Sequence, residues 1–160
     1  HGPSKDVCMD GWRVGWGAFP PAVVRRAEIR KQSRVNSAPT LSQIAARVAL
    51  QETGHSEGQR ARYAANREVL AEGLAGLGFG VGTGVDGAFY NYVDVSRFTN
   101  DSLGFCQALL KTAGVAATPG VDFDRIDGHR YVRFSFAGSG ESIASAIERM
   151  AALDLASLGQ

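Results

Sequence analysis

The sequence predicts an α/β fold, because patterns typical of helices and patterns typical of strands alternate along the chain. Residues 22–34, 59–77 and 139–152 carry apolar side chains at helical spacing, and residues 87–95 and 131–136 alternate as strands do. The 160 residues suffice for one ordinary core or two small ones, since a domain typically holds about 100–150 residues.

The first part of the chain predicts a short strand followed by a helix. Residues 11–16, with the sequence G-W-R-V-G-W, alternate enough for a short strand. Pro20 and Pro21 favour a turn and then the first turn of a helix, because the fixed φ of proline suits the first helical position. The helix over residues 22–34 is expected to end at residues 36–39.

A second helix and a candidate domain boundary follow. Thr40 or Ser42 is expected to cap the second helix through its side-chain oxygen. Residues 54–58 (G-H-S-E-G) are polar and mark a candidate boundary, after which residues 59–77 carry the longest helical pattern. The apolar stripe predicted for the second helix consists of Leu41, Ile44, Ala45, Val48 and Ala49.

Strand patterns prevail in the next segment. Residues 79–81 and residues 87–95 predict two strands, separated by the turn-rich sequence T-G-V-D-G at residues 83–87. Asp101 is expected to cap a helix that extends through Lys111.

The last part of the chain predicts two more strands and a closing helix. Residues 115–118 predict a short strand and residues 131–136 (Y-V-R-F-S-F) a clear one. Ser139 is expected to cap the helix over residues 139–152. Alternation along the clear strand places Tyr131, Arg133 and Ser135 on one face and Val132, Phe134 and Phe136 on the other.

Charge and cysteine content narrow the classes of partner. Seventeen basic and sixteen acidic side chains give a net charge of +1, which leaves no basic face for nucleic acid. Cys8 and Cys106 cannot build a disulfide framework, so we expect a reducing, cytoplasmic compartment. The longest uncharged run, residues 73–85, has 13 residues, fewer than the roughly 18 that suggest a membrane span. We therefore expect a soluble protein with no nucleic-acid or membrane partner.

Three patterns that look like ligand sites lack the necessary context. Residues 82–87 fit G-x-G-x-x-G, yet dinucleotide binding needs a helix after the glycines, and residues 88–95 predict a strand. Residues 122–128 begin like a calcium loop but lack its later acidic ligands. The histidines have no metal-ligand spacing and are expected at the surface: His1, His55 and His129.

Three cationic residues remain as candidates for chemistry. Lys5 lies in a tight segment after Pro3, and an exposed loop lysine is the simpler interpretation. Arg13 lies within the apolar residues 11–16, and a buried arginine requires an anion, either a carboxylate or a phosphate. Arg133 is either a solvated residue on its strand face or a fork that binds a carboxylate through two N–H groups.

The order of four short motifs resembles a known enzyme family. Residues 4–16, S-K-D-V-C-M-D-G-W-R-V-G-W, resemble the cofactor-lysine segment of fold-type I pyridoxal phosphate aminotransferases of class I/II. In that segment a lysine precedes, by eight residues, an arginine within G-x-R-x-G; here these residues are Lys5 and Arg13. Later landmarks of the same family are similar to residues 87–90 (G-A-F-Y), 118–123 (T-P-G-V-D-F) and 131–137 (Y-V-R-F-S-F-A).

The resemblance implies a role for each candidate residue. Lys5 would form a Schiff base with pyridoxal 5'-phosphate and, once released, act as the general base that moves the substrate proton. Arg13, together with Ser4, would bind the cofactor phosphate, and Arg133 would bind the α-carboxylate of the amino acid substrate. The implied reaction transfers an amino group from an α-amino acid to a 2-oxo acid, and members of this family form homodimers with active sites at the subunit interface.

The resemblance also implies the domain organisation. Residues 1–57 would be the end of the large cofactor-binding domain, and residues 58–160 the small C-terminal α/β domain of the aspartate-aminotransferase-like fold.

Because the chain begins at His1, close to the lysine segment, we interpret it as the C-terminal part of a longer protein. In this family the aspartate at the pyridine nitrogen, the stacked aromatic residue and the glycine-rich phosphate turn precede the lysine. We therefore expect the 160-residue chain to be inactive alone.

Two positions depart from the family pattern, and two alternative functions share the fold. Gly2 stands where many relatives have a second phosphate-binding hydroxyl, and Asp124 stands where glycine is common. A lyase or decarboxylase would use the same Lys5 and Arg13, and product analysis would distinguish either of them from an aminotransferase. An aminotransferase-like effector domain of a transcription regulator would bind the cofactor without turnover, and an upstream winged-helix domain would indicate it.

Overall fold

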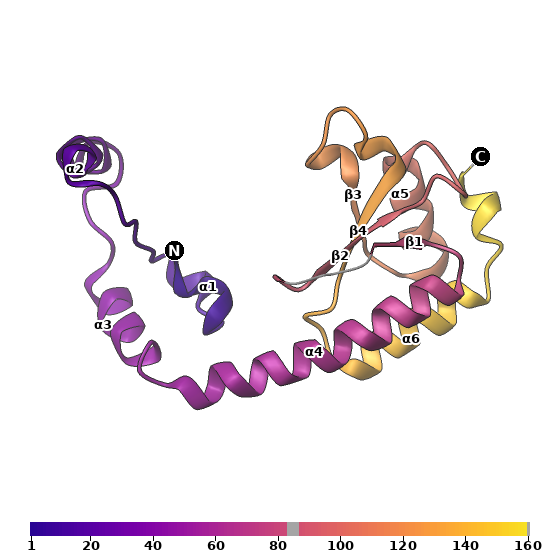
Figure 1. Ribbon diagram of the computed structural model, residues 1–160, viewed down its shortest axis with the longest axis horizontal. Coiled ribbons are helices and arrows are strands. Elements are labelled where there is room, and N and C mark those ends of the chain that lie inside the picture. Colours follow the sequence, from indigo (N-terminus) through magenta and orange to yellow (C-terminus); the bar gives the residue numbers. More distant parts are fainter. Residues whose placement is uncertain (83–86, 160) are drawn as a thin grey trace. The chain divides into compact units, whose positions relative to one another are not determined.

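The structure is a computed structural model that describes residues 1–82 and 87–159. It divides into two compact units, His1–Arg60 and Ala61–Gln160. Helix α4 (Thr53–Gly76) contributes residues to both units (Figure 1). Within the described residues, no helix combines the length and the apolar composition needed to cross a membrane.

The first unit is helical and buries few side chains. Helix α2 (Pro21–Val35) begins with a proline at its first turn, which confirms the helix predicted there. The other elements are α1 (Pro3–Asp6), the 3-10 helix η1 (Asp10–Trp12), α3 (Thr40–Ala49) and the start of α4.

The strand predicted for residues 11–16 is wrong. The segment begins inside the 3-10 helix η1, and Arg13 follows it in the left-handed conformation with a φ of 50°. A short strand requires a neighbouring strand to satisfy its backbone groups. Here the backbone closes locally instead, because the Arg13 N–H donates to the carbonyl of Asp10 at 3.5 Å.

The predicted start signals of α3 and α4 are also wrong. Pro39 occupies the N-cap position of α3, and no side chain caps that end, so neither Thr40 nor Ser42 serves as the cap. Residues 54–58 form the first turns of α4 rather than a break. Each glycine in a helix costs about 1 kcal/mol relative to alanine. Helix α4 nevertheless includes both glycines of this segment within its 24 residues.

The second unit contains an antiparallel sheet with the strand order β1-β2-β4-β3. The strands predicted for residues 79–81, 87–95 and 131–136 are confirmed, whereas the one predicted for residues 115–118 overlaps β3 only at Thr118. The turn predicted at residues 83–87 falls largely on residues 83–86, which lie outside the described residues. The strands are β1 (Gly80–Val81), β2 (Tyr90–Asp94), β3 (Thr118–Pro119) and β4 (Tyr131–Ser135).

Three helices supply the core that covers the inner face of this sheet: α4, α5 (Ser102–Ala113) and α6 (Gly140–Ala151). The predicted caps are confirmed, since Asp101 accepts the Gly104 N–H and Ser139 accepts the Ser142 N–H. Short 3-10 helices complete the unit, namely η2 (Gly120–Asp122), η3 (Gly128–Arg130) and η4 (Leu155–Gly159). The most deeply buried apolar side chains of the core are Leu74, Val93, Val95, Phe105, Leu109, Val132 and Met150.

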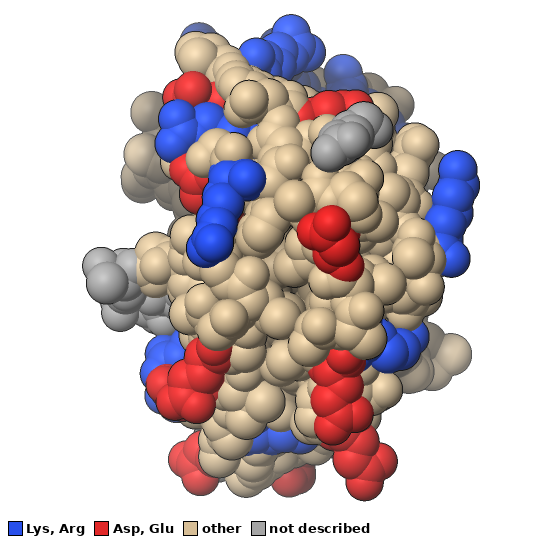
Figure 2. Space-filling view, turned by 90° about the vertical axis from the view of Figure 1, so that its right-hand side faces the viewer, with Lys and Arg blue, Asp and Glu red and all other residues tan. Residues whose placement is uncertain are grey.

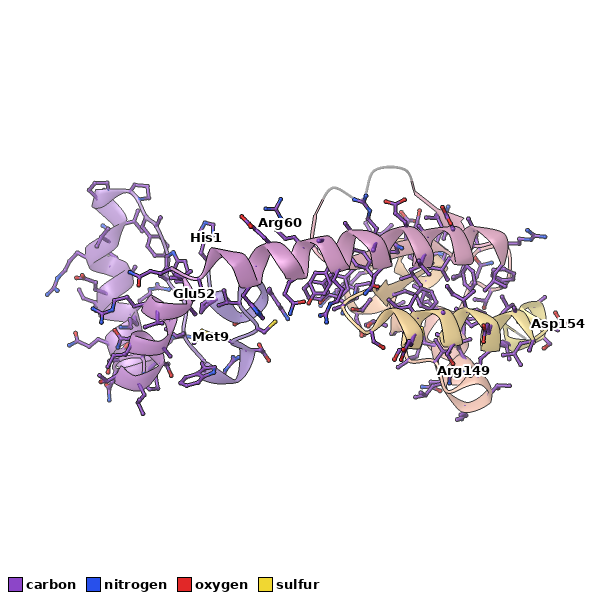
Figure 3. All side chains as sticks on the ribbon, turned by 90° about the horizontal axis from the view of Figure 1, so that it is seen from below. His1, Met9, Glu52, Arg60, Arg149 and Asp154 are labelled. Carbon is purple, nitrogen blue, oxygen red and sulfur yellow. The ribbon has the colours of Figure 1, made fainter. Side chains whose placement is uncertain are left out.

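Helices α4 and α6 lie side by side in this unit (Figures 1 and 3). A Cβ at Gly73 of α4 would collide with the side chain of Ile147 of α6, so glycine permits the close approach. Arg149, labelled in Figure 3, donates from α6 to the carbonyl of Ala113 at 2.7 Å and so satisfies the C-terminal end of α5.

The two faces of the sheet differ as the alternation in β4 predicts. Val132 and Phe134 are buried in the core, whereas Tyr131 and Arg133 are half-buried and Ser135 is exposed on the opposite face. That opposite face is therefore available for polar chemistry.

The side of the molecule shown in Figure 2 carries cationic and anionic side chains around a largely uncharged centre.

Candidate functional site

The segment that contains Lys5 and Arg13 forms a loop closed by backbone hydrogen bonds. The Val7 and Met9 N–H groups donate to the carbonyl of Pro3 at 3.2 and 3.3 Å, and the Trp16 N–H donates to the carbonyl of His1 at 2.9 Å. Lys5 is exposed on α1 within this loop. Residues 1–16 thus hold the predicted lysine and arginine on one local framework.

One glycine lies where the ends of this loop approach each other closely. A Cβ at Gly15 would lie 3.1 Å from the carbonyl oxygen of His1, which is a tight contact. A Cβ at Gly2 would lie 3.5 Å from the carbonyl oxygen of Val14, an ordinary van der Waals contact, so packing does not explain the glycine at position 2. Ser4, the other candidate hydroxyl of the segment, is half-buried on α1.

Arg13 is exposed, which corrects the prediction of a buried arginine. Its side chain is 75% exposed; Nη1 donates to the backbone carbonyl of Asp10 at 3.0 Å and lies 3.5 Å from the Asp10 carboxylate. An ion pair between exposed side chains contributes about 0–1 kcal/mol. The Asp10 carboxylate therefore holds the Arg13 side chain only weakly.

The start of α4 holds the lysine loop and borders a cavity of about 210 Å³. Ser56 donates to the carbonyl of Asp6 at 3.2 Å, and the Gln59 amide contacts the sulfur of Cys8 at 3.6 Å. Three carboxylates and one arginine line the cavity, which makes it unsuited to a phosphate. These charged residues are Asp6, Glu52, Glu57 and Arg60, of which Glu52 and Arg60 are labelled in Figure 3.

Arg133 is placed by the register of the sheet. It lies opposite Tyr92 of β2 on one side and opposite Thr118 of β3 on the other. Its Nη2 donates to the Thr118 hydroxyl at 3.4 Å. Among the residues described by the structure, no carboxylate lies within ion-pair distance of Arg133, so its positive charge is available to an external anion.

Two aromatic rings flank the same guanidinium group. Its central carbon lies 4.1 Å from the ring centre of Tyr90 and 4.3 Å from that of Phe123. The Phe123 and Asp124 N–H groups both donate to the carbonyl of Gly120 at 2.9 Å, which fixes the turn that carries the Phe123 ring. A Cβ at Gly120 would lie 2.5 Å from a backbone oxygen of Gly128, so this turn requires glycine.

A small cavity of about 120 Å³ adjoins Arg133. Sites that enclose a whole drug-sized ligand usually have about 300 Å³ or more, so this cavity suits one end of a ligand. Burial, followed by the negative charge of Asp124, raises the pKa of the nearby Tyr92, which keeps that phenol neutral. The cavity is lined by Tyr90, Ala116, Ala117, Thr118, Arg133 and Ser135.

The structure thus brings together part of the predicted site and adds neighbours that the sequence did not assign. Ser4, Lys5 and Arg13 share the loop of the first unit, and Arg133 lies on the open sheet face of the second. Tyr90, Thr118 and Phe123 lie in segments that resemble family landmarks, but the sequence alone assigned no role to these side chains. Only the strand register shows that they surround Arg133. The three histidines are exposed, as predicted.

Comparison with known proteins identifies the family. The family model described as aminotransferase class I and II matches residues 1–150, and the chain belongs to this family. A valine–pyruvate aminotransferase of Mycobacterium tuberculosis is 44% identical over 149 residues, which cover 92% of this chain and 38% of the relative. An aspartate/prephenate aminotransferase of Thermus thermophilus is 36% identical over 155 residues, which cover 94% of this chain and 39% of the relative.

Solved structures confirm the predicted fold. A crystal structure of an aminotransferase from Mycobacterium tuberculosis matches with a TM-score of 0.86 and 43% identity, over 92% of this chain and 39% of that one. A double mutant of Thermus thermophilus aspartate aminotransferase matches with a TM-score of 0.82 and 34% identity, over 94% of this chain and 39% of that one. The chain therefore has the α/β fold of aspartate aminotransferases and spans about two fifths of the length of these relatives.

Proposed function

We propose that the complete protein containing this chain is a pyridoxal phosphate-dependent aminotransferase that transfers the amino group of an α-amino acid to a 2-oxo acid. The observation that carries this proposal is the loop of residues 1–16, which presents Lys5 and Arg13 to solvent from one closed framework. Membership of the class I and II aminotransferase family supports the reaction type.

The donor groups on this loop fit a phosphorylated aldehyde. Lys5 offers a primary amine, Ser4 a hydroxyl, and Arg13 a guanidinium group whose partner Asp10 is weakly held. Pyridoxal phosphate, when bound, supplies a reactive carbonyl carbon and an electron-withdrawing ring. Arg13 and Ser4 would hold its phosphate group.

Lys5 would act as the general base of the reaction. Its Nζ atom must lose a proton before it can accept one from the α-carbon of the substrate. Arg133 would bind the substrate α-carboxylate, because it is half-buried and its hydrogen-bond partner Thr118 is uncharged.

The assignment of regions and the state of the complete protein belong to the same proposal. Residues 1–57 would end the large cofactor-binding domain, and residues 58–160 would form the small domain. A cytoplasmic homodimer is proposed from the family resemblance, and light scattering on the complete protein would measure its mass in solution.

The proposal is tested by replacing Lys5 with alanine in the complete protein. A general base contributes about 10²- to 10⁴-fold to the rate, so we expect Lys5→Ala to lower kcat by at least about 10²-fold and to abolish the visible absorption band of the bound cofactor. Transfer of the amino group to an added 2-oxo acid, measured as formation of a new amino acid, separates transamination from elimination, which releases ammonia, and from decarboxylation, which releases carbon dioxide.

The matched control is Lys31→Ala, since Lys31 is an exposed lysine on α2. This control should keep the activity and the absorption band of the wild type. An unchanged spectrum in Lys5→Ala would show that another residue binds the cofactor and would overturn the proposal.

A further inference from the structure

The guanidinium group of Arg133 is approached by aromatic rings from both sides of its strand. Strand β4 lies between β2 and β3 in the sheet. Tyr90 belongs to β2, and Phe123 lies four residues beyond the end of β3. The ring centres lie 4.1 and 4.3 Å from the central carbon of Arg133, within the roughly 6 Å over which cation–π attraction acts.

Register and a tight turn produce this arrangement. Arg133 pairs with Tyr92 across the ladder between β2 and β4, so Tyr90, two residues earlier on the same face, is its diagonal neighbour. Phe123 is carried over the sheet by the turn at Gly120, whose carbonyl accepts its N–H. We call the rings of Tyr90 and Phe123 the aromatic clamp.

The clamp restricts the directions from which an anion can reach Arg133. All five N–H donors of a guanidinium group lie in its plane. Both ring centres lie close to the central carbon of the guanidinium group. The cavity of about 120 Å³, lined in part by Tyr90, Thr118 and Arg133, is the side from which an anion would reach its N–H groups. An aromatic face carries partial negative charge, so it repels an anionic oxygen placed above or below the plane.

From this geometry we propose that the aromatic clamp makes Arg133 selective for planar carboxylates over tetrahedral oxyanions such as phosphonates. A carboxylate places both oxygens in the guanidinium plane and accepts two parallel hydrogen bonds. A phosphonate has a third oxygen outside that plane, which would meet the ring of Tyr90 or Phe123. This inference rests on the proposed function, which assigns Arg133 to the substrate α-carboxylate.

Tyr90 and Phe123 are thus positioning residues that act through Arg133. Their attraction holds the guanidinium plane, while Thr118 holds one of its nitrogens through the 3.4 Å hydrogen bond. Loss of either ring should weaken binding of the carboxylate more than it slows the chemical step. The KM for an amino acid should therefore rise while kcat changes little.

The experiment compares L-alanine with L-1-aminoethylphosphonate as amino donors for the complete, cofactor-loaded protein. The ratio of their kcat/KM values measures selectivity for the planar anion. We expect Tyr90→Leu and Phe123→Leu each to lower this ratio by roughly 3- to 30-fold, the range that a cation–π contact contributes. Tyr90→Phe and Phe123→Tyr keep a ring and should retain the wild-type ratio.

Two further variants separate the possible outcomes. Phe19→Leu is the matched control, because Phe19 is 53% exposed, as Phe123 is at 55%, but lies in the first unit. Arg133→Gln tests the underlying assignment and should raise the KM for L-alanine strongly. If Arg133→Gln leaves that KM unchanged, the assignment of Arg133 fails. If Arg133→Gln raises the KM for L-alanine while Tyr90→Leu and Phe123→Leu keep the wild-type ratio of kcat/KM values, the selectivity proposed for the aromatic clamp is refuted. The assignment of Arg133 to the carboxylate would then stand.

Discussion

At the scale of single residues, the two arginines of the proposed site differ in what holds them. Arg13 lies on a loop with an exposed carboxylate 3.5 Å away, so its position depends on whichever anion is present. Arg133 lies on a central strand, where the Thr118 hydroxyl and two rings fix it without an anion. In the proposed function, Arg13 would exchange Asp10 for the ligand's own negative charge, whereas Arg133 would already be held in place before substrate binds.

The role of Arg13 is tested by Arg13→Gln in the complete protein. We expect the Kd for pyridoxal phosphate, measured by fluorescence titration, to rise about tenfold or more, because a charge-assisted hydrogen bond to phosphate contributes about 1.5–3 kcal/mol. Arg25→Gln is the matched control, since Arg25 forms a similar exposed pair with Glu28 at 3.4 Å. Equal cofactor affinity in the two variants would contradict the phosphate role.

At the scale of elements, local signals define the ends of the helices around the sheet. Asp101 caps α5 through a 3.0 Å bond from the Gly104 N–H, and Gly114 ends the same helix in the left-handed conformation with a φ of 62°. Ser139 starts α6 in the same way as Asp101 starts α5. These caps fix the length of the helices that cover the inner sheet face, opposite the face that carries Arg133.

The contribution of the first cap is tested by Asp101→Ala. We expect the free energy of unfolding, measured by urea denaturation, to fall by about 1 kcal/mol, because the Gly104 N–H loses its acceptor. Asp101→Asn keeps an acceptor oxygen and should recover most of the loss. A full loss in the asparagine variant would mean that charge, rather than the hydrogen bond, stabilises this end of α5.

At the scale of the whole molecule, the two units differ in their cores. The buried apolar cluster lies entirely within the second unit. In the first unit, three side chains of the stripe predicted for α3 are 51% to 72% exposed, namely Leu41, Ile44 and Val48. Burial of apolar side chains is the main favourable contribution to folding. Within the described residues, most of this hydrophobic stabilisation therefore comes from the second unit.

The ion pair between Asp94 and Arg130 makes this stability depend on pH. Burial alone would raise the pKa of Asp94, but hydrogen bonds from Ser96 and Arg130 outweigh burial and lower it. Because the folded pKa is depressed, the stabilisation is present above the unfolded value of about 3.9 and is lost as pH falls through the folded pKa. Asp94→Asn should thus be less stable than the wild type by a constant amount from pH 7 to about 5.

The difference between wild type and Asp94→Asn should shrink once the pH falls below about 4, because protonation removes the same charge from the wild type. Urea denaturation at a series of pH values measures this difference. If the difference in free energy of unfolding between the wild type and Asp94→Asn stays constant down to pH 2.5, the stabilisation that Asp94 provides does not depend on its charge.

Features that depend on near neighbours in the chain were predictable from the amino-acid sequence. The proline start of α2, the alternation in β4 and the caps at Asp101 and Ser139 each depend on one residue and the backbone within four positions of it. The family was indicated by four short motifs in the expected order, of which the segment with Lys5 and Arg13 is the first.

Contacts between residues far apart in the sequence depend on tertiary packing and could not be predicted. The apolar residues 11–16 found no partner strand, so they closed into a loop and left Arg13 exposed. The surroundings of Arg133 came from β2, β3 and the turn at Gly120, which the register of the sheet brings together. Alternation along a strand assigns a face to each side chain, but the pairing of strands determines its neighbours on that face.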